Sequence, residues 1–245
     1  MSQRLLEPPL SLLDGAALLL DFDGTLVELA ETPDAIRIPA DLPALIARLS
    51  FRLDGRVAIV SGRSLEDLER HAGPLPVAFA GSHGVEIRMG GEVERSRLPA
   101  GLSPARDALA RFAAEDPRLL VEDKPGTVAL HFRGAPDREA DSAALAADLA
   151  RRHGLRVQAG KMVVELLPEG VDKGRALERL MAEPSFAGAR PWFMGDDLTD
   201  EHAFAAAARA GGGGILVGPE RETAAGWRLA DVPAARRWLT EAAGG

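Results

Sequence analysis

The sequence of 245 residues contains no cysteine and no tyrosine. Without cysteine the chain can form no disulfide, no thiolate metal site and no cysteine nucleophile. It also has no excess of basic residues, because the formal net charge is −8. Nucleic-acid binding requires a basic face, so we expect no nucleic-acid partner. A small phosphorylated substrate is still compatible with this charge, since a metal ion and a few local cations can override the global field.

Long apolar stretches are missing as well. The apolar run at 16–20 is long enough for a buried strand but too short to span a membrane. Residues 1–15 contain no h-region of a signal peptide. With 46% hydrophobic and 27% charged residues, the composition is that of an ordinary soluble globular protein. We therefore expect a cytoplasmic monomer with no membrane partner.

Strand-like runs alternate with helical periods in the first third of the chain. Apolar runs at 16–20, 56–60 and 77–80 are typical of buried strands, and the segments from 42 to 49 and from 64 to 72 have helical spacing. A strand-helix-strand order of this kind predicts a parallel sheet with right-handed crossovers.

The middle of the chain has a different pattern. Between residues 86 and 168, hairpins alternate with helices, which predicts a small α+β domain inserted into the sheet. The first pattern then returns, with a strand at 191–194, a flexible glycine loop at 211–214 and a short strand at 215–217. The expected fold class is α/β, with a Rossmann-like parallel-sheet core from residues 1–85 and 169–245 and the insert at 86–168.

Two aspartates follow the first strand. Because side chains alternate along a strand, Asp21 and Asp23 should converge on one face at its end. The carboxyl edge of an open α/β sheet is where such folds bind ligands. Two ionised carboxylates repel each other, so a divalent cation should bridge them or one should be protonated. A solvated Asp-x-Asp-Gly turn is the alternative.

Four separated motifs end a strand or open a helix, and they come in a fixed order: Asp21-Phe-Asp-Gly-Thr-Leu26, Ser61-Gly-Arg63, Asp172-Lys-Gly174 and Gly195-Asp-Asp-Leu-Thr-Asp200. Together they resemble the haloacid dehalogenase-like phosphatase superfamily, and the gap between the second and third motifs leaves room for an insert. The resemblance implies a haloacid dehalogenase-like core, a substrate-specificity cap formed by the insert, and a phosphatase that uses Mg²⁺.

The resemblance also implies roles for the motif residues. Asp21 would attack phosphorus and form an aspartyl-phosphate. Mg²⁺ would be held by Asp21, the backbone carbonyl of Asp23 and Asp196. Lys173 and Ser61 would contact the transferring oxygens. Asp23 would protonate the leaving oxygen and then deprotonate the attacking water.

Other motif residues have a structural alternative. Asp197 and Asp200 would orient the metal site and Lys173, but acidic residues in a first helical turn also stabilise the helix itself. Arg63 is interpreted as a structural cation beside the site. Taken alone, Ser61 would be a turn or cap residue and Lys173 a solvated lysine at a helix start.

More specific segments are similar to the trehalose-6-phosphate phosphatase family. These are Gly81-Ser-His-Gly-Val-Glu86, Glu122-Asp-Lys124 followed by Ala129-Leu-His-Phe-Arg133, and Lys161 with Val164-Glu-Leu-Leu-Pro168. The resemblance covers nearly the whole chain and implies hydrolysis of trehalose 6-phosphate in trehalose biosynthesis. A phosphatase of sucrose phosphate or mannosyl-phosphoglycerate is one alternative, and a non-catalytic regulatory module that binds a sugar phosphate is another.

The residues expected to bind the substrate are polar positions of the core and of the insert: Thr25, Gly62, Arg63, His83, Glu86, Glu122, Lys124, His131, Arg133, Lys161 and Glu165. The spacing of His131 and Arg133 would place both on one strand face. Charged residues on edge strands can instead serve only to block aggregation, and His83 and Glu86 could support a hinge between core and insert.

Overall fold

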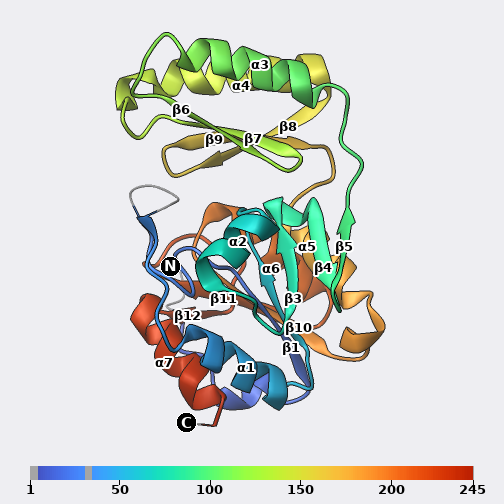
Figure 1. The fold of residues 1–245 in the computed structure, drawn as a ribbon. Coiled ribbons are helices and arrows are strands. Elements are labelled where there is room, and N and C mark those ends of the chain that lie inside the picture. The colour runs from blue at the N-terminus through green and yellow to red at the C-terminus, as the bar shows by residue number, and fades with distance from the viewer. Residues whose placement is uncertain (1–4, 31–34, 245) are drawn as a thin grey trace. The chain divides into compact units, whose positions relative to one another are not determined.

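The structure is a computed structural model that describes residues 5–30 and 35–244. Its largest feature is an eight-stranded sheet in the order β12-β11-β10-β1-β2-β3-β4-β5 (Figure 1). The strands are β1 (Ala16–Leu20), β2 (Val57–Val60), β3 (Ala78–Gly81), β4 (Glu86–Met89), β5 (Glu92–Arg95), β10 (Arg190–Gly195), β11 (Gly213–Val217) and β12 (Trp227–Leu229).

The six strands from β12 to β3 are parallel, and β4 pairs with β3 in antiparallel fashion. Strand β1 lies between β10 and β2, with Leu20 in register with Met194 on one side and with Ile59 on the other. The chain runs outward from β1 in one direction through β2 and β3, and later in the other direction through β10, β11 and β12. This is a topological switch point, where open α/β sheets bind their ligands.

Helices cover both faces of the large sheet (Figure 1). On one face α1 (Leu42–Arg52), α2 (Leu65–Ala72) and α7 (Val232–Ala242) contribute to a core with the apolar residues of β1 and β2. On the other face α5 (Lys173–Met181) and α6 (Glu201–Arg209) pack in a second core. β1 has its whole length buried, as expected for a central strand covered on both faces.

Short 3₁₀ turns complete the connections: η1 (Leu10–Leu13), η3 (Ser82–Gly84), η4 (Pro136–Arg138), η5 (Pro184–Phe186) and η6 (Leu198–Asp200). Two of them, η3 and η6, follow the carboxyl ends of β3 and β10. They therefore lie at the edge of the sheet where Asp21 ends β1.

The second compact unit spans residues 95–171. It contains an antiparallel sheet in the order β6-β7-β9-β8, formed by β6 (Leu120–Lys124), β7 (Thr127–His131), β8 (Leu155–Gly160) and β9 (Val163–Pro168). Helices α3 (Leu102–Ala113) and α4 (Glu139–His153) bury one face of this sheet in a core of its own. Because side chains alternate along a strand, the other face carries the polar residues of β6, β7 and β9.

The structure confirms the α/β class, the parallel core sheet and a small α+β insert. The larger unit takes the described residues of 1–94 and 172–245. We had assigned the strand that begins at Glu86 to the insert, but β4 pairs with β3 and extends the large sheet. The hairpin pattern at 86–95 did not distinguish an insert from an edge extension, because both are antiparallel.

The expectation of a flexible glycine loop at 211–214 was wrong for its second half. Gly213 and Gly214 belong to β11, which pairs with β10. A Cβ at Gly213 would lie 2.7 Å from the ring of Trp192, and one at Gly214 would lie 2.6 Å from the ring of Phe204. The two glycines therefore leave room for aromatic rings on the sheet, and they do not mark a loop.

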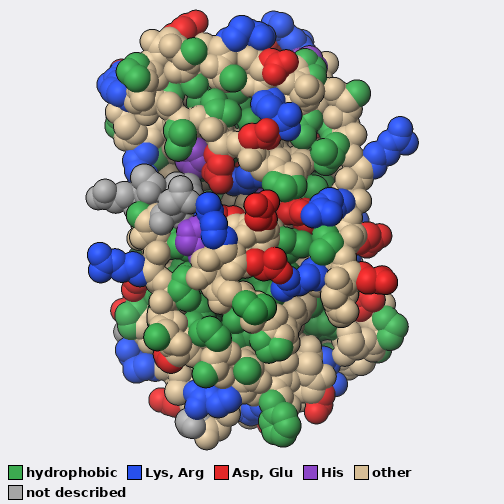
Figure 2. Space-filling model, in the orientation of Figure 1, with side chains coloured by type: hydrophobic (Ala, Val, Ile, Leu, Met, Phe, Trp, Pro, Cys, Tyr) green, Lys and Arg blue, Asp and Glu red, His purple; other side chains and the backbone are tan. Residues whose placement is uncertain are grey.

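In the described part of the chain, none of the helices is long and apolar enough to cross a membrane. Acidic and basic side chains are interspersed over the visible face of each unit (Figure 2).

Candidate active site

Three neighbouring strands bring predicted residues to one edge of the large sheet. Asp21 follows β1, Ser61 follows β2, and Asp196 follows β10, and these strands are adjacent in the order β10-β1-β2. The Asp21 backbone N–H extends the pairing by donating to the carbonyl of Met194 at 2.9 Å. A fourth residue, Lys173, is the first residue of α5. Motifs separated by up to 175 residues of sequence therefore belong to one site within the larger unit.

Lys173 joins two carboxylates in the interior of this site. Its Nζ donates to Oδ1 of Asp21 at 2.7 Å and to Oδ1 of Asp200 at 2.6 Å. The exposed fraction of the side chain is 4% for Lys173, 6% for Asp21 and 0% for Asp200. A buried lysine is tolerated when ion pairs compensate for its desolvation, and two carboxylates provide them here.

The turn after β10 orients Asp200. Its Oδ2 accepts the backbone N–H of Asp197 at 2.9 Å, so both oxygens of Asp200 are engaged. The side chain of Asp197 accepts the N–H of Leu198 at 2.7 Å and caps η6. Asp200 thus binds Lys173, and the side chain of Asp197 caps the turn.

Burial and like charges raise two carboxyl pKa values in the cluster. Desolvation raises the pKa of Asp21 well above its ordinary value of 3.8, and Lys173 opposes this effect. Desolvation, followed by repulsion from Asp200, raises the pKa of Asp196 to about 7. For Lys173, burial lowers the pKa, but Asp200 and Asp21 together raise it above its ordinary value. The cluster therefore has one cation for three buried or half-buried carboxylates.

This donor set fits a divalent metal ion. Asp21, Asp196 and Asp200 each offer a carboxylate oxygen, and these atoms lie within 4.8 Å of one another. Hard oxygen donors of this kind suit Mg²⁺. Because Lys173 and a backbone N–H occupy the oxygens of Asp200, Asp21 and Asp196 are the better candidates for direct ligands. The carboxylate of Asp23 is not part of this cluster, and a metal ligand at its backbone carbonyl stays a prediction.

Gly24 allows Asp196 to approach the loop after β1. Its φ is +79°, and a Cβ built there would lie 2.2 Å from Oδ2 of Asp196. Only glycine combines the left-handed backbone with the absence of a side chain at this contact. Gly24 is therefore needed for the loop after β1 to approach Asp196, which lies in the loop after β10.

Asp23 makes a two-point ion pair with Arg63. The Nε and Nη2 of Arg63 donate to the two carboxylate oxygens of Asp23 at 2.6 and 2.9 Å. Arg63 also donates to Asp67, which lies in the first turn of α2. Asp67 was not predicted, although its position four residues after Arg63 on a helical pattern could have indicated the pair. The interpretation of Arg63 as a structural cation agrees with this geometry.

Ser61 lies against the loop that contains His83. The Ser61 hydroxyl accepts the N–H of Arg63 at 3.1 Å, and its carbonyl accepts the N–H of His83 at 2.9 Å. The ring of His83 packs on Gly62, where a Cβ would lie 2.8 Å from Cε1. His83 has a φ of +58°, which is costly for a residue with a side chain. Gly62 and His83 therefore form one tight contact at the sheet edge.

Two predicted substrate contacts are interior residues in the structure. Glu86 is 1% exposed, and its Oε2 accepts the N–H of Leu65 at the start of α2. Thr25 is fully buried. Asp21, Ser61 and Lys173 are buried to a similar degree, so burial alone does not separate a substrate contact from a residue that supports the loops of the site.

The polar face of the smaller sheet gathers most of the predicted residues of the insert. Glu122 accepts from Nε2 of His131 at 2.8 Å, and Nζ of Lys124 lies 3.6 Å from Glu122 and 3.4 Å from Glu165. The hydroxyl of Thr127 donates to Oε1 of Glu165 at 2.6 Å. Thr127 was not predicted, although its place four residues before His131 on one strand puts both on the same face.

Two other residues of the insert lie outside this cluster. Strand β7 ends at His131, so Arg133 falls in the following turn and is exposed. The prediction that His131 and Arg133 share a strand face was therefore wrong. Lys161 is exposed in the turn between β8 and β9.

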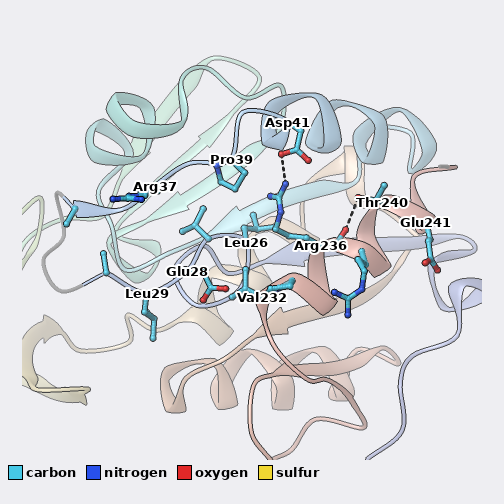
Figure 3. A pocket seen from close by; sticks show the side chains of 15 residues that line it. Leu26, Glu28, Leu29, Arg37, Pro39, Asp41, Val232, Arg236, Thr240 and Glu241 are labelled. Atoms are coloured by element: carbon cyan, nitrogen blue, oxygen red, sulfur yellow. Dashed lines mark hydrogen bonds and ion pairs between the residues drawn. The ribbon is translucent and has the colours of Figure 1, made fainter.

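A separate cavity of about 880 Å³ lies in the larger unit between the segment after β1 and α7 (Figure 3). Its floor is apolar, with Leu26, Val27 and Val232 among the lining residues. The charged residues of its lining are Glu28, Arg37, Asp41, Arg236, Arg237 and Glu241, and Arg236 pairs with Asp41 at 2.6 Å. None of the predicted site residues lines this cavity, so it is separate from the candidate active site.

The sequence is similar to two proteins that are described as trehalose-phosphate phosphatases. The chain is 41% identical over 210 residues to the probable trehalose-phosphate phosphatase of Sinorhizobium fredii (strain NBRC 101917 / NGR234), covering 84% of this chain and 79% of the relative. It is 38% identical over 244 residues to the trehalose-6-phosphate phosphatase of Escherichia coli (strain K12), covering 98% of this chain and 90% of the relative.

Solved structures agree in fold. A structure described as a trehalose-6-phosphate phosphatase related protein matches with a TM-score of 0.78 and 29% identity, over 94% of this chain and 97% of the other. The C-terminal domain of the Candida albicans trehalose-6-phosphate phosphatase matches with a TM-score of 0.85 over 100% and 99% of the two chains, and its 23% identity supports the fold alone. The sequence model of the family described as trehalose-phosphatase matches residues 19–233. On these grounds the chain belongs to the trehalose-phosphatase family.

Proposed function

We propose that this chain is a Mg²⁺-dependent phosphatase that hydrolyses trehalose 6-phosphate to trehalose and phosphate. The observation that carries the proposal is the buried ion pair of Lys173 with Asp21, beside Asp196, in a chain of the trehalose-phosphatase family. A nucleophile held by a buried cation at a strand end meets the main demand of the reaction, which is to bring a carboxylate close to a phosphate dianion.

Asp21 acts as the nucleophile. An Oδ atom of Asp21 forms a bond to phosphorus while the bond from phosphorus to the sugar oxygen breaks, and the electron pair leaves with that oxygen. Lys173 offsets negative charge as the phosphoryl group transfers. The Ser61 hydroxyl accepts from the Arg63 N–H, which leaves its own proton for a phosphoryl oxygen. Mg²⁺ held by Asp21, Asp196 and the Asp23 carbonyl would supply further electrostatic stabilisation.

Asp23 handles the protons. It gives a proton to the leaving sugar oxygen in the first half of the reaction. In the second half, a water oxygen bonds to phosphorus as the bond from phosphorus to Asp21 breaks, and Asp23 accepts the proton of that water. Arg63 binds both carboxylate oxygens of Asp23 and orients it for these transfers.

The polar face of the insert recognises the sugar in this proposal. A disaccharide has many hydroxyls and no charge beyond its phosphate, so its site needs ordered donors and acceptors. Lys124 holds Glu122 and Glu165 near each other, and Thr127 fixes Glu165. Residues 95–171 would thus serve as the cap that selects the substrate, and the larger unit as the catalytic core.

The test is a phosphate-release panel with Mg²⁺ that compares trehalose 6-phosphate, sucrose 6-phosphate, glucose 6-phosphate and mannosyl-phosphoglycerate. We expect kcat/KM to be highest for trehalose 6-phosphate and release to stop in EDTA. A preference for another member would overturn the substrate assignment. Release from none would favour a regulatory module that binds a sugar phosphate. The proposal includes a cytoplasmic monomer, to be tested by cell fractionation and size-exclusion chromatography.

A further inference from the structure

A single arginine connects the acidic turn of the site to the next loop of the sheet. Arg221 follows β11, the strand adjacent to β10, so the loops after both strands emerge at the same sheet edge. Its Nη2 donates to the backbone carbonyl of Asp197 at 2.9 Å, and its Nη1 donates to Oε1 of Glu201. The other oxygen of Glu201 accepts the N–H of Ala224 at 2.7 Å.

These bonds fix both ends of the turn that contains Asp200. Asp197 is the N-cap of η6 and Glu201 begins α6, so the arginine spans the turn from the residue before it to the residue after it. Within the turn, the Asp197 N–H orients Asp200, and Asp200 orients Lys173. Asp196 directly precedes the turn. A shift of the Asp197 peptide would therefore move a predicted metal ligand and the partner of Lys173 together.

We propose that Arg221 is a positioning residue for the metal site, acting through the Asp197–Glu201 turn. The inference rests on the proposed function, because it concerns the metal that the phosphatase reaction would use. Arg221 touches none of the predicted ligands by its side chain, and no sequence motif of the site includes it. Its planar guanidinium suits the task because one rigid group can bind a carbonyl and a carboxylate at the same time.

The magnitude follows from the behaviour of residues that orient metal ligands. Loss of such a partner typically weakens metal affinity by about 10- to 100-fold. Arg221 acts one bond further out, through the Asp197 peptide, so Arg221→Gln should raise the dissociation constant for a divalent ion by about tenfold, the lower end of this range. The KM for trehalose 6-phosphate at saturating Mg²⁺ should change little, since Arg221 lies in neither the predicted phosphate contacts nor the sugar-binding face.

Arg228 provides a matched control in the same segment. Its side chain is 21% exposed against 22% for Arg221. It donates to the carbonyl of Gly218 at 2.6 Å and lies 3.6 Å from Glu220, so it ties the same loop without reaching the acidic turn. Arg228→Gln should alter stability to a similar degree while leaving metal affinity at the wild-type value.

The experiment measures Mn²⁺ binding to the full chain by electron paramagnetic resonance, together with the Mg²⁺ dependence of turnover. Weaker Mn²⁺ binding by Arg221→Gln, with Arg228→Gln unchanged, supports the inference. Equal affinity in wild type and Arg221→Gln overturns it and leaves the proposed function intact. Absence of Mn²⁺ binding by the wild type overturns the metal-dependent function itself. If Arg221→Gln does not fold, Glu201→Gln, which removes one charge of the same ion pair, is subject to the same comparison.

Discussion

Replacement of Lys173 by methionine tests the buried ion pairs without any assumption about the reaction. The substitution keeps an apolar stem of similar length but leaves Asp21 and Asp200 without their shared cation. Both carboxylates are almost fully buried. Removal of one partner from a buried ion pair typically costs about 3–5 kcal/mol, because the remaining charge must be neutralised or solvated. We therefore expect Lys173→Met to lose about this much free energy of unfolding.

The loss should be visible in thermal unfolding. For proteins of this size about 1 kcal/mol corresponds to 2–4 °C in Tm, so a decrease of about 6–20 °C is expected by circular dichroism without added metal. Arg175→Met is the control on the same helix. Its ion pair with Glu178 is 67% and 42% exposed, and such surface pairs contribute at most about 1 kcal/mol.

A triple variant distinguishes lost charge pairing from lost packing. Lys173→Met combined with Asp21→Asn and Asp200→Asn removes all three charges and retains similar volumes. Because the triple variant leaves no buried charge without a partner, it should recover the part of the lost stability that comes from unpaired charge. A Tm of Lys173→Met within about 3 °C of the wild type, or no recovery in the triple variant, would refute the account of Lys173 as the shared partner of two buried carboxylates.

Three further predictions concern separate parts of the molecule. Gly24→Ala should lose metal affinity and activity, because its Cβ would lie 2.2 Å from the Asp196 carboxylate. Gly15→Ala is the control: the backbone has a similar positive φ with nothing within 4 Å, so this variant should keep both properties at a strain cost of roughly 1–2 kcal/mol. Burial raises the pKa of Asp67, but two arginines outweigh this and hold the pKa below 3.8. The stability from this carboxylate is therefore complete above about pH 5 and is lost as the pH falls through the lowered value. Asp67→Asn should flatten the acid side of a plot of Tm against pH, and an unchanged slope would contradict the pairing. Lys124→Met should raise the KM for trehalose 6-phosphate about tenfold or more, because a charge-assisted contact is lost. The KM for p-nitrophenyl phosphate, which has no sugar, should stay near the wild-type value, and an equal rise for the two substrates would argue against a sugar-binding face.

The sequence predicted the core of the site because its signals are local. Buried strands are short apolar runs, and the carboxyl ends of parallel strands must meet at one edge. Placing Asp21, Ser61 and Asp196 side by side needed only the order of strands and helices. Lys173 could be added from its position at a helix start within a recognisable motif.

What the sequence did not predict depends on contacts between distant residues. The near-complete burial of Glu86 and Thr25 is one example. Arg133 was placed on a strand that ends two residues earlier, because strand ends are set by pairing with a partner strand. Arg221 belongs to no motif, and only the adjacency of β10 and β11 brings it to the acidic turn.

The most direct test of the central claim is to trap the covalent intermediate. Substrate labelled in the phosphate group is mixed with enzyme and Mg²⁺, the reaction is quenched in acid within one turnover, and the label is located by peptide mapping. We expect hydroxylamine-labile label on Asp21, and no label or turnover in Asp21→Asn with its fold retained. Label on another residue, or phosphate release by Asp21→Asn at the wild-type rate, would contradict the assignment of Asp21 as the nucleophile.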